Sequence, residues 1–422
     1  MRNYFSKYVL KKVVRFLRWS EKLTRTDVRY VLASNFWLNF GRLISISTGL
    51  VLTAAFANML SPEVFGTYKY VLAAAGTINA FTLNGMGNAL LRAVAQKKEH
   101  VVPYAVRVTM LWSIPASLAS SGISIYYFWH NNEVLGWGFL FIAIYNVLAN
   151  GYGLAKSVLL ATGKFKKSLV ISLPRSIFPV LVILITLLIS KNIVWILLAY
   201  FTSNIIGNWV MYRWTLRTLN IKASKKDFKE TLTLGKHMSV LGFFMLLSGQ
   251  IDQLLLFHFS GSATLAIYAL AIAPLSEART LLDNSTTILF PRLAARSKED
   301  ARASISFRVK QMFVVSAVAT CLYILFIPIL FELLFPKYLP SVLATQVMAL
   351  TLLFEPRGIL DAYIFAHGEI KERYKWILSS QAVEFVLYLV LIPLFGLWGA
   401  VAATVLSEIG AAGTLFVVYK RM

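Results

Sequence analysis

The chain has 422 residues, of which 58% are apolar and only 14% are charged, and its mean hydropathy is +0.66. Charged residues make up about a quarter of an ordinary soluble protein, so this composition excludes that class. One membrane crossing takes about 20 apolar residues, so the apolar residues suffice for about twelve helices. We therefore predict an all-α, polytopic membrane protein with no sizeable soluble domain.

The charge balance is strongly basic, with 42 Lys and Arg against 19 Asp and Glu and a net charge of +23. In an apolar chain this excess is typical of basic cytoplasmic loops, so we expect a lipid bilayer and no nucleic acid as partner. The single cysteine, Cys321, lies in an apolar run, which excludes a disulfide within the chain and a thiolate metal site. We expect Cys321 to be a small buried residue.

Residues 1–29 carry nine basic side chains, and Lys11 and Lys12 interrupt the apolar run that a cleaved signal peptide needs. Apolar and basic residues recur there at helical spacing, which predicts an amphipathic helix on the cytoplasmic surface of an anionic membrane. A plain basic flank explains the same pattern.

Twelve apolar stretches of about 20 residues or more follow, separated by polar residues. The expected spans are 31–58, 67–91, 106–128, 135–160, 169–190, 193–212, 237–259, 264–290, 309–331, 341–367, 374–394 and 397–419.

The basic residues fall almost entirely on one side of this twelve-span arrangement. When the first residues of each span are counted with the connection before it, the termini and the even-numbered connections hold 35 of the 42. The opposite connections hold three, Lys69, Lys191 and Lys337. The remaining four lie inside spans and are Arg42, Lys156, Arg279 and Arg357. Since basic loops stay in the cytoplasm, both termini are predicted to be cytoplasmic.

An internal repeat divides the chain into two halves. Residues 61–68, 92–95 and 161–164 have counterparts at 261–268, 292–295 and 366–369, offset by 200, 200 and 205 residues. Matched segments leave the same face, so the repeat is parallel, with its axis along the membrane normal. We predict six-helix lobes at 30–212 and 237–422, joined by a basic linker at 213–236.

Five short motifs carry a family resemblance. They are LSPEVFGTY at 60–68, GMGNALLR at 85–92, IDQLLL at 251–256, FPRL at 290–293 and GLWGA at 396–400. In this order and spacing they resemble the polysaccharide-exporter, or O-antigen flippase, branch of the multidrug and oligosaccharidyl-lipid (MATE-like) transporter superfamily. The resemblance runs from about residue 30 to the end of the chain.

The resemblance implies two six-helix bundles around a central cavity that opens alternately to either side of a bacterial inner membrane. The implied cargo is undecaprenyl-pyrophosphate bearing an oligosaccharide, moved to the outer leaflet for lipopolysaccharide, capsule or related surface polysaccharide. A polysaccharide polymerase is then a candidate partner. The resemblance implies no fixed set of substrate residues.

Cations within the spans are the candidates for binding the pyrophosphate. A charge at mid-membrane costs roughly 2.5–3.5 kcal/mol on insertion scales, so retained charges usually face a cavity or a partner. The candidates are Arg42, Arg279, Arg357 and Lys156. Guanidinium groups suit phosphate oxygens, and Arg42 has no acidic residue in its own span, which favours a substrate role there.

Structural roles also explain the other three cations. Asp283 and Asp361 follow Arg279 and Arg357 by four residues and could neutralise them within the helix. Lys156 is close enough to the predicted cytoplasmic interface for its side chain to reach it, which favours a structural role.

The acidic residues inside spans belong to the second half of the chain. A buried carboxylate can carry a proton or ligate sodium, and so couple transport to an ion gradient. The candidates for such coupling are Asp252, Glu277, Asp283 and Asp361, with Asp252 and Glu277 favoured. Pairing with the intramembrane arginines is the alternative for each of them.

No nucleotide-binding or catalytic motif stands out, so we expect no enzyme activity, no cofactor, and energy from an H+ or Na+ gradient. A cation-coupled multidrug antiporter of the same superfamily is the alternative, and it would need an acidic cavity. A membrane polysaccharide polymerase or ligase is less favoured, because such enzymes normally present a large extracytoplasmic loop and the outward connections expected here are short.

Overall fold

The computed structural model describes residues 28–163, 165–294, 298–367 and 370–421, and all regular structure in these ranges is helical. The helices are α2 Val28–Met59, α3 Pro62–Ala80, α4 Met86–Ala95, η1 Glu99–Val101, α5 Val102–Trp112, α6 Ile114–Trp129, α7 Glu133–Gly153, α8 Ala155–Ala161, α9 Phe165–Ile189, α10 Ile193–Leu219, α11 Phe228–Ala294, α12 Lys298–Leu334, η2 Pro336–Tyr338, α13 Ser341–Met348, η3 Ala349–Phe354, α14 Arg357–His367 and α15 Ile370–Arg421. The predicted surface helix at 1–29 lies outside the described residues, apart from the last two, which begin α2.

The helices are long and apolar enough to confirm a multi-pass membrane protein. Eight stretches of the described residues could cross a membrane by length and composition, and two of them contain 55 and 47 residues. A crossing needs about 20 residues, so each of these two is long enough for two crossings. Gly261 (φ 84°) and Gly396 (φ 57°) interrupt them, in a backbone region that glycine adopts without steric cost.

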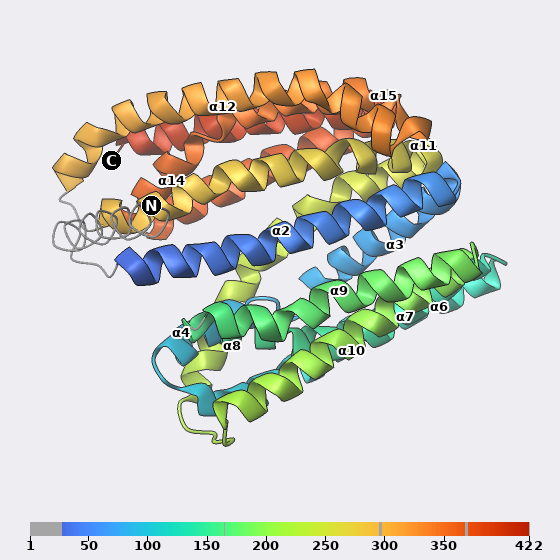
Figure 1. The fold of residues 1–422 in the computed structure, drawn as a ribbon, viewed down its shortest axis with the longest axis horizontal. Helices are drawn as coiled ribbons and strands as arrows, with labels where there is room; N and C mark the ends of the chain where they lie inside the picture. Colours follow the sequence, from blue (N-terminus) through green and yellow to red (C-terminus); the bar gives the residue numbers. More distant parts are fainter. Residues whose placement is uncertain (1–27, 164, 295–297, 368–369, 422) are drawn as a thin grey trace, which may run out of the picture.

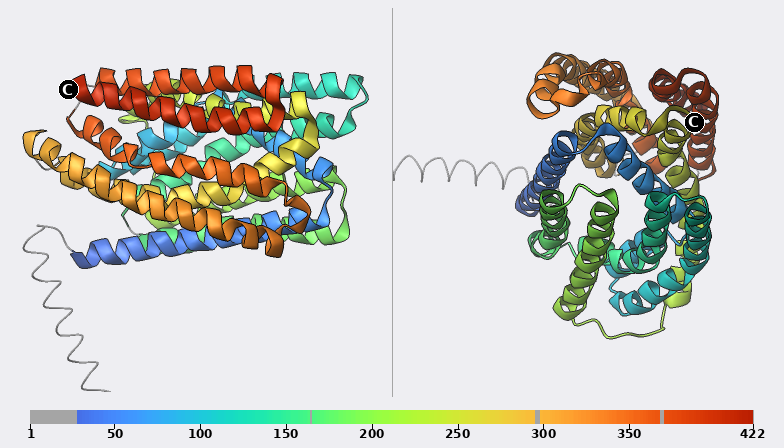
Figure 2. Two further views of the ribbon diagram at one scale, coloured as in Figure 1. Left: turned by 90° about the horizontal axis from the view of Figure 1, so that it is seen from above. Right: turned by 90° about the vertical axis from the view of Figure 1, so that its right-hand side faces the viewer.

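The helices run along the long axis of the molecule, and α11 and α15 each reach one end and return (Figure 1). We call residues 28–219 the first half and residues 228–421 the second half. Seen along the long axis, most helices of the two halves lie on opposite sides (Figure 2). We call the end where α2 begins and α4 and α15 end the basic end, and the other the opposite end (Figure 1).

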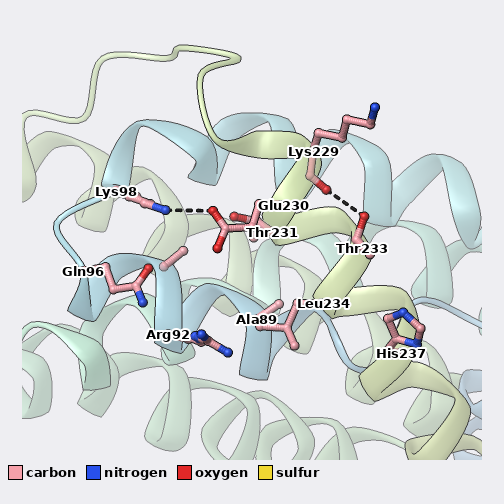
Figure 3. A pocket seen from close by; sticks show the side chains of 11 residues that line it. Ala89, Arg92, Gln96, Lys98, Lys229, Glu230, Thr231, Thr233, Leu234 and His237 are labelled. Carbon is pink, nitrogen blue, oxygen red and sulfur yellow. Dashed lines mark hydrogen bonds and ion pairs between the residues drawn. The ribbon is translucent and has the colours of Figure 1, made fainter.

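At the basic end, the start of α11 packs on the first half. The predicted linker is mostly helical, because α10 continues to Leu219 and α11 begins at Phe228. Phe228 and Leu232 contact a buried cluster of first-half residues that includes Met86 and Val102. Lys98 Nζ binds Glu230 Oε2 at 2.9 Å (Figure 3). A separate cluster around Tyr363 and Leu415 belongs to the second half alone.

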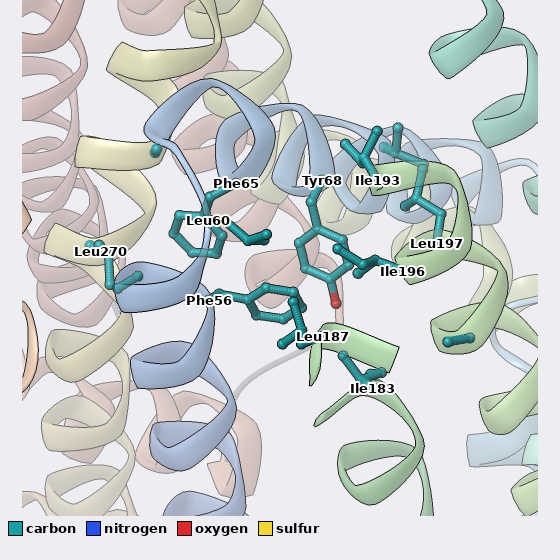
Figure 4. Packing of buried hydrophobic residues seen from close by; sticks show 14 of the residues in the cluster. Phe56, Leu60, Phe65, Tyr68, Ile183, Leu187, Ile193, Ile196, Leu197 and Leu270 are labelled. Carbon is teal, nitrogen blue, oxygen red and sulfur yellow. The ribbon is translucent and has the colours of Figure 1, made fainter. Parts of the chain in front are cut away.

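At the opposite end, one buried cluster joins the two halves (Figure 4). Phe56 and Phe65 from the first half pack with Leu270, Phe331 and Tyr338 from the second. Between helices in lipid, dispersion contacts and close backbone approach provide the attraction, since water is not excluded there. The two halves are therefore closed against each other at this end.

Polar contacts reinforce this closure. Asn58 Nδ2 donates to the carbonyl of Leu334 at 2.8 Å, and Lys337 Nζ donates to the carbonyl of Asn58 at 2.7 Å. These bonds connect the end of α2 in the first half to the end of α12 and to η2 in the second half.

Cys321 is exposed on α12, so the expectation that it is buried is wrong. The apolar run around it predicts a membrane span, but apolarity does not distinguish a lipid-facing side chain from a core one. Many apolar residues of α12 are exposed, including Val318, Leu322 and Leu325, which is what a helix at the lipid boundary presents.

Candidate substrate and coupling site

A cavity of about 240 Å³ lies between α2, α3 and α11, where the two halves of the chain meet. Its apolar lining comes mainly from α2 and from α11 after Gly261. Its polar residues are Thr53, Lys69, Gln253, Ser276 and Glu277. A concave site that combines apolar walls with a few polar groups is a common form of a ligand site.

Lys69 lies inside α3 and not in a connection as predicted. Its Nζ is 5.4 Å from the centre of the Phe65 ring, and its side chain lines the cavity. The signal was present in the sequence, because Lys69 follows the helix start at Pro62 by seven residues. The expected span 67–91 begins only two residues before Lys69, so Lys69 is counted with the connection before it, whereas α3 begins at Pro62.

Glu277 is the one predicted coupling residue that lines this cavity. Among the described residues, no Lys, Arg or His forms an ion pair with it. The cavity therefore carries one cation on α3 and one carboxylate on α11.

Arg279 and Arg357 are tied to glutamates of the second half. Arg279 Nε lies 2.8 Å from Glu355 Oε1, and Arg279 Nη2 lies 2.7 Å from Glu408 Oε1. Arg357 Nη1 pairs with Glu408 Oε2. Two guanidinium groups and two carboxylates thus form one neutral cluster between α11, α14 and α15.

These partners differ from the Asp283 and Asp361 predicted within the same helices. The η3–α14 break at Pro356 places Glu355 beside α11, since proline cannot continue the hydrogen bonding of a preceding helical turn. The glutamates are almost fully buried and need a cation, which the long arginine side chains supply from neighbouring helices. The side chain of Asp283 lies outside the described residues, and Asp361 is partly buried on α14.

Three cations gather in the first half. Lys156 on α8 lies close enough to Arg42 on α2 and Arg175 on α9 for their charges to repel its own. Arg175 Nε donates a hydrogen bond to Asn208 Oδ1 of α10. Lys156 is therefore one member of a group of three cations, in which Arg42 is another of the predicted pyrophosphate-binding candidates.

Arg175 is a further candidate cation that the sequence analysis does not name. It lies ten residues into α9 and was counted with the basic residues of the preceding connection. Its position within the expected span 169–190, directly after Pro174, was the signal that could have identified it.

Asp252 is 6% exposed and lies at the centre of a polar network on α11 and α15. Its carboxylate accepts hydrogen bonds from the Tyr268 hydroxyl and from the backbone N–H of Gln253, both at 2.8 Å. The hydroxyl of Thr404 lies 3.4 Å from that of Tyr268 and 3.1 Å from that of Tyr388. No basic side chain forms an ion pair with Asp252 in the described part of the chain.

This network could hold a proton or a small hard cation, because it combines one carboxylate with hydroxyl oxygens. Gln253, the next residue after Asp252, lines the cavity, so the network and the cavity share one turn of α11. The described residues contain no group of three or more His, Cys, Asp and Glu side chains suited to a metal ion.

A model of the family described as polysaccharide biosynthesis protein matches residues 31–296 of this chain. A search of the curated proteins found no match to this chain.

Solved structures show the same fold. The structure described as lipid II flippase MurJ in an inward closed conformation is 13% identical, with a TM-score of 0.69, over 92% of this chain and 87% of that one. An outward-facing multidrug resistance MATE family transporter is 15% identical, with a TM-score of 0.60, over 92% and 94%. A MOP superfamily transporter from Pyrococcus furiosus, described as having a binding pocket of reverse polarity, is 14% identical, with a TM-score of 0.61, over 92% and 95%.

Proposed function

Because the chain belongs to the polysaccharide biosynthesis protein family, we propose that it is a flippase for undecaprenyl-pyrophosphate-linked oligosaccharide in a bacterial inner membrane. It moves this lipid from the cytoplasmic to the outer leaflet by alternating access, for surface polysaccharide assembly, with a polysaccharide polymerase as candidate partner. The chain crosses the membrane twelve times as two six-helix lobes with cytoplasmic termini, and α11 and α15 provide two crossings each.

The cation cluster of Arg42, Lys156 and Arg175 is the observation that carries this proposal. The first half contains no acidic residue between 64 and 98 or between 134 and 219, so α8 and α9 offer Lys156 and Arg175 no carboxylate of their own. A positive charge within the membrane costs free energy, so its retention favours an anionic ligand. A pyrophosphate is such a ligand. The neutral cluster around Arg279 and Arg357 has a structural role in this state.

Closure at the opposite end supports a cytoplasm-facing state. The cluster of Phe56, Phe65 and Tyr338 seals the end that the positive-inside rule places outside. Arg42 precedes the cavity residue Ile46 by about one turn of α2 on the basic side. Arg42 therefore lies toward the leaflet from which the lipid is taken.

Removing the first-half cations is expected to abolish most transport. In proteoliposomes containing a fluorescent undecaprenyl-pyrophosphate oligosaccharide, the Lys156→Gln/Arg175→Gln double variant should flip the lipid at least about tenfold more slowly than wild type. Losing charge-assisted bonds to phosphate costs more than the 1.4 kcal/mol that this factor represents. Arg213→Gln, which neutralises an exposed arginine of α10, is the control and should retain the wild-type rate. Equal rates in all three proteins would exclude a pyrophosphate site at this cluster.

A cation-coupled multidrug antiporter is the second candidate, and Glu277 in the cavity favours it. A cationic dye in the same vesicles distinguishes the two. Dye movement that Glu277→Gln abolishes, with the lipid left in its leaflet, would replace the flippase by an antiporter.

Coupling to an ion gradient is assigned to Asp252 in this proposal. Its carboxylate is buried, lacks a basic ion-pair partner among the described residues and lies one residue from the cavity, so an H+ or Na+ bound there would neutralise it. Glu384, one turn before Tyr388 on α15, adds a second carboxylate near this network.

An Asp252→Asn variant should flip lipid at one rate whether or not a gradient is imposed. Asparagine keeps the shape and the acceptor for Tyr268 but cannot gain or lose the charge. Wild type should accelerate under either a Na+ or an H+ gradient, which identifies the ion. Glu332→Gln, at an exposed acid of α12, should respond as wild type does. A gradient response preserved in Asp252→Asn would refute the assignment.

A further inference from the structure

A second pocket, of about 490 Å³, lies at the basic end between α4 and the first turns of α11 (Figure 3). Four basic or imidazole side chains line it, Arg92, Lys98, Lys229 and His237. Its neutral polar lining is Gln96, Thr231 and Thr233, and its apolar lining is Ala89, Ala93 and Leu234. This pocket has no part in the proposed transport path.

The charge of the pocket is positive. Glu230 is its one acidic residue and is already bound by Lys98 at 2.9 Å. Arg92 and Lys229 form no ion pair with any carboxylate in the part of the chain that the structure describes. Arg92 and the exposed, flexible side chain of Lys229 thus remain available to an anion, and the amide of Gln96 can donate a further hydrogen bond to it. The hydroxyls of Thr231 and Thr233 already donate to the carbonyls of Asp227 and Lys229.

The surroundings of the pocket favour a lipid as the source of that anion. From Lys236 to Phe244, α11 also lines an apolar groove of about 520 Å³ with Phe81 and Trp112. Lys236 Nζ lies 4.9 Å from the centre of the Trp112 ring. Paired Trp and Lys side chains are typical of the membrane interface, where lipid phosphates lie.

We propose that the Arg92–Lys229 pocket binds the phosphate of an anionic glycerophospholipid, with an acyl chain lying along the groove at Phe81 and Phe244. The lipid then joins α4 of the first half to α11 of the second. The site is independent of the cargo and would exist in a drug antiporter as well.

Lipid titration of the purified full chain in detergent tests this site. Binding of phosphatidylglycerol, measured by native mass spectrometry, should weaken about tenfold in Arg92→Gln/Lys229→Gln. The control is Lys222→Gln/Lys226→Gln, which removes the same charge from exposed residues of the neighbouring connection and should change the affinity less than about twofold. Equal weakening in both variants would mean general charge attraction and would overturn the proposal.

A variant that is expected to strengthen lipid binding distinguishes loss of a specific site from damage to the fold. Glu230→Gln removes the competing carboxylate and frees Lys98, so phosphatidylglycerol binding should strengthen severalfold. The Lys98–Glu230 pair is exposed at Glu230 and contributes little to stability, so the fold should persist. Weaker lipid binding in this variant would refute the pocket.

Glycerol 3-phosphate and phosphatidylcholine are the remaining probes. The first carries the phosphate without acyl chains and the second carries a neutral headgroup, so both should bind at least about tenfold more weakly than phosphatidylglycerol. Glycerol 3-phosphate binding as tightly as the lipid would identify a soluble phosphate ester as the ligand and overturn the lipid assignment.

Discussion

A Gly66→Ala variant is expected to lose most of the state that is closed at the opposite end. A Cβ atom at Gly66 would lie 1.7 Å from the carbonyl oxygen of Ser262, which is backbone and cannot rotate away. The first turns of α3 and of the returning segment of α11 would have to separate. Overpacking of this kind costs about 1–3 kcal/mol, so the ratio of closed to open molecules should fall by about 5- to 150-fold.

Cross-linking of two cysteines across this end by a short bifunctional maleimide measures the change. Asn58→Cys and Lys337→Cys place thiols on residues that are hydrogen-bonded across the two halves, in a background in which Cys321 is replaced by Ala. Adding Gly66→Ala should lower the cross-linked fraction and slow lipid flipping, because one of the alternating states becomes rare.

Gly122→Ala is the matched control for this substitution. Gly122 is exposed on α6 and does not line the cavity, and a Cβ atom there would have nothing within 4 Å. This variant should cross-link and transport as wild type does. A cross-linked fraction that Gly66→Ala leaves unchanged would show that the contact between Gly66 and Ser262 is not needed for closure.

The sequence predicted the class of fold because lipid imposes strong constraints on it. A helix that crosses a bilayer must satisfy its own backbone hydrogen bonds over about 20 apolar residues, and that pattern is readable without a structure. Gly261 and Gly396 also fall in predicted connections. Each helical hairpin needs a residue that accepts positive φ at its turn, and glycine does so without steric cost. The boundaries were less certain, and this is why Lys69 and Arg175 were assigned to connections although they lie in helices.

The pairing of the charges could not be predicted, because it depends on which helices are neighbours. Asp283 lies one turn from Arg279 in sequence, yet Arg279 binds Glu355 and Glu408, which lie 76 and 129 residues further along the chain. Glu408 lies within the expected span 397–419, but nothing in its local sequence indicates its partner. The cation cluster of Lys156 and Arg175 is similar, since it joins α8 to α9 through tertiary packing.

A Glu408→Gln variant is expected to be the most destabilised of the single substitutions considered. Glu408 binds Arg279 and Arg357 together, and its side chain is only 10% exposed. Removing its charge leaves two guanidinium groups with one paired glutamate, Glu355, in a region of low dielectric. Removing one partner of a buried ion pair costs about 3–5 kcal/mol, because the remaining charge is left without compensation.

Thermal unfolding in detergent can be monitored through the loss of monodisperse protein. The unfolding midpoint of Glu408→Gln should be markedly lower than that of wild type. A second substitution tests its origin. In Arg357→Met/Glu408→Gln one arginine and one glutamate of the cluster remain, and Arg279 pairs with Glu355. The unfolding midpoint of this double variant should therefore lie between those of Glu408→Gln and wild type. A double variant that loses the sum of the two single effects would instead mean that Glu408 stabilises the protein through packing and not through charge.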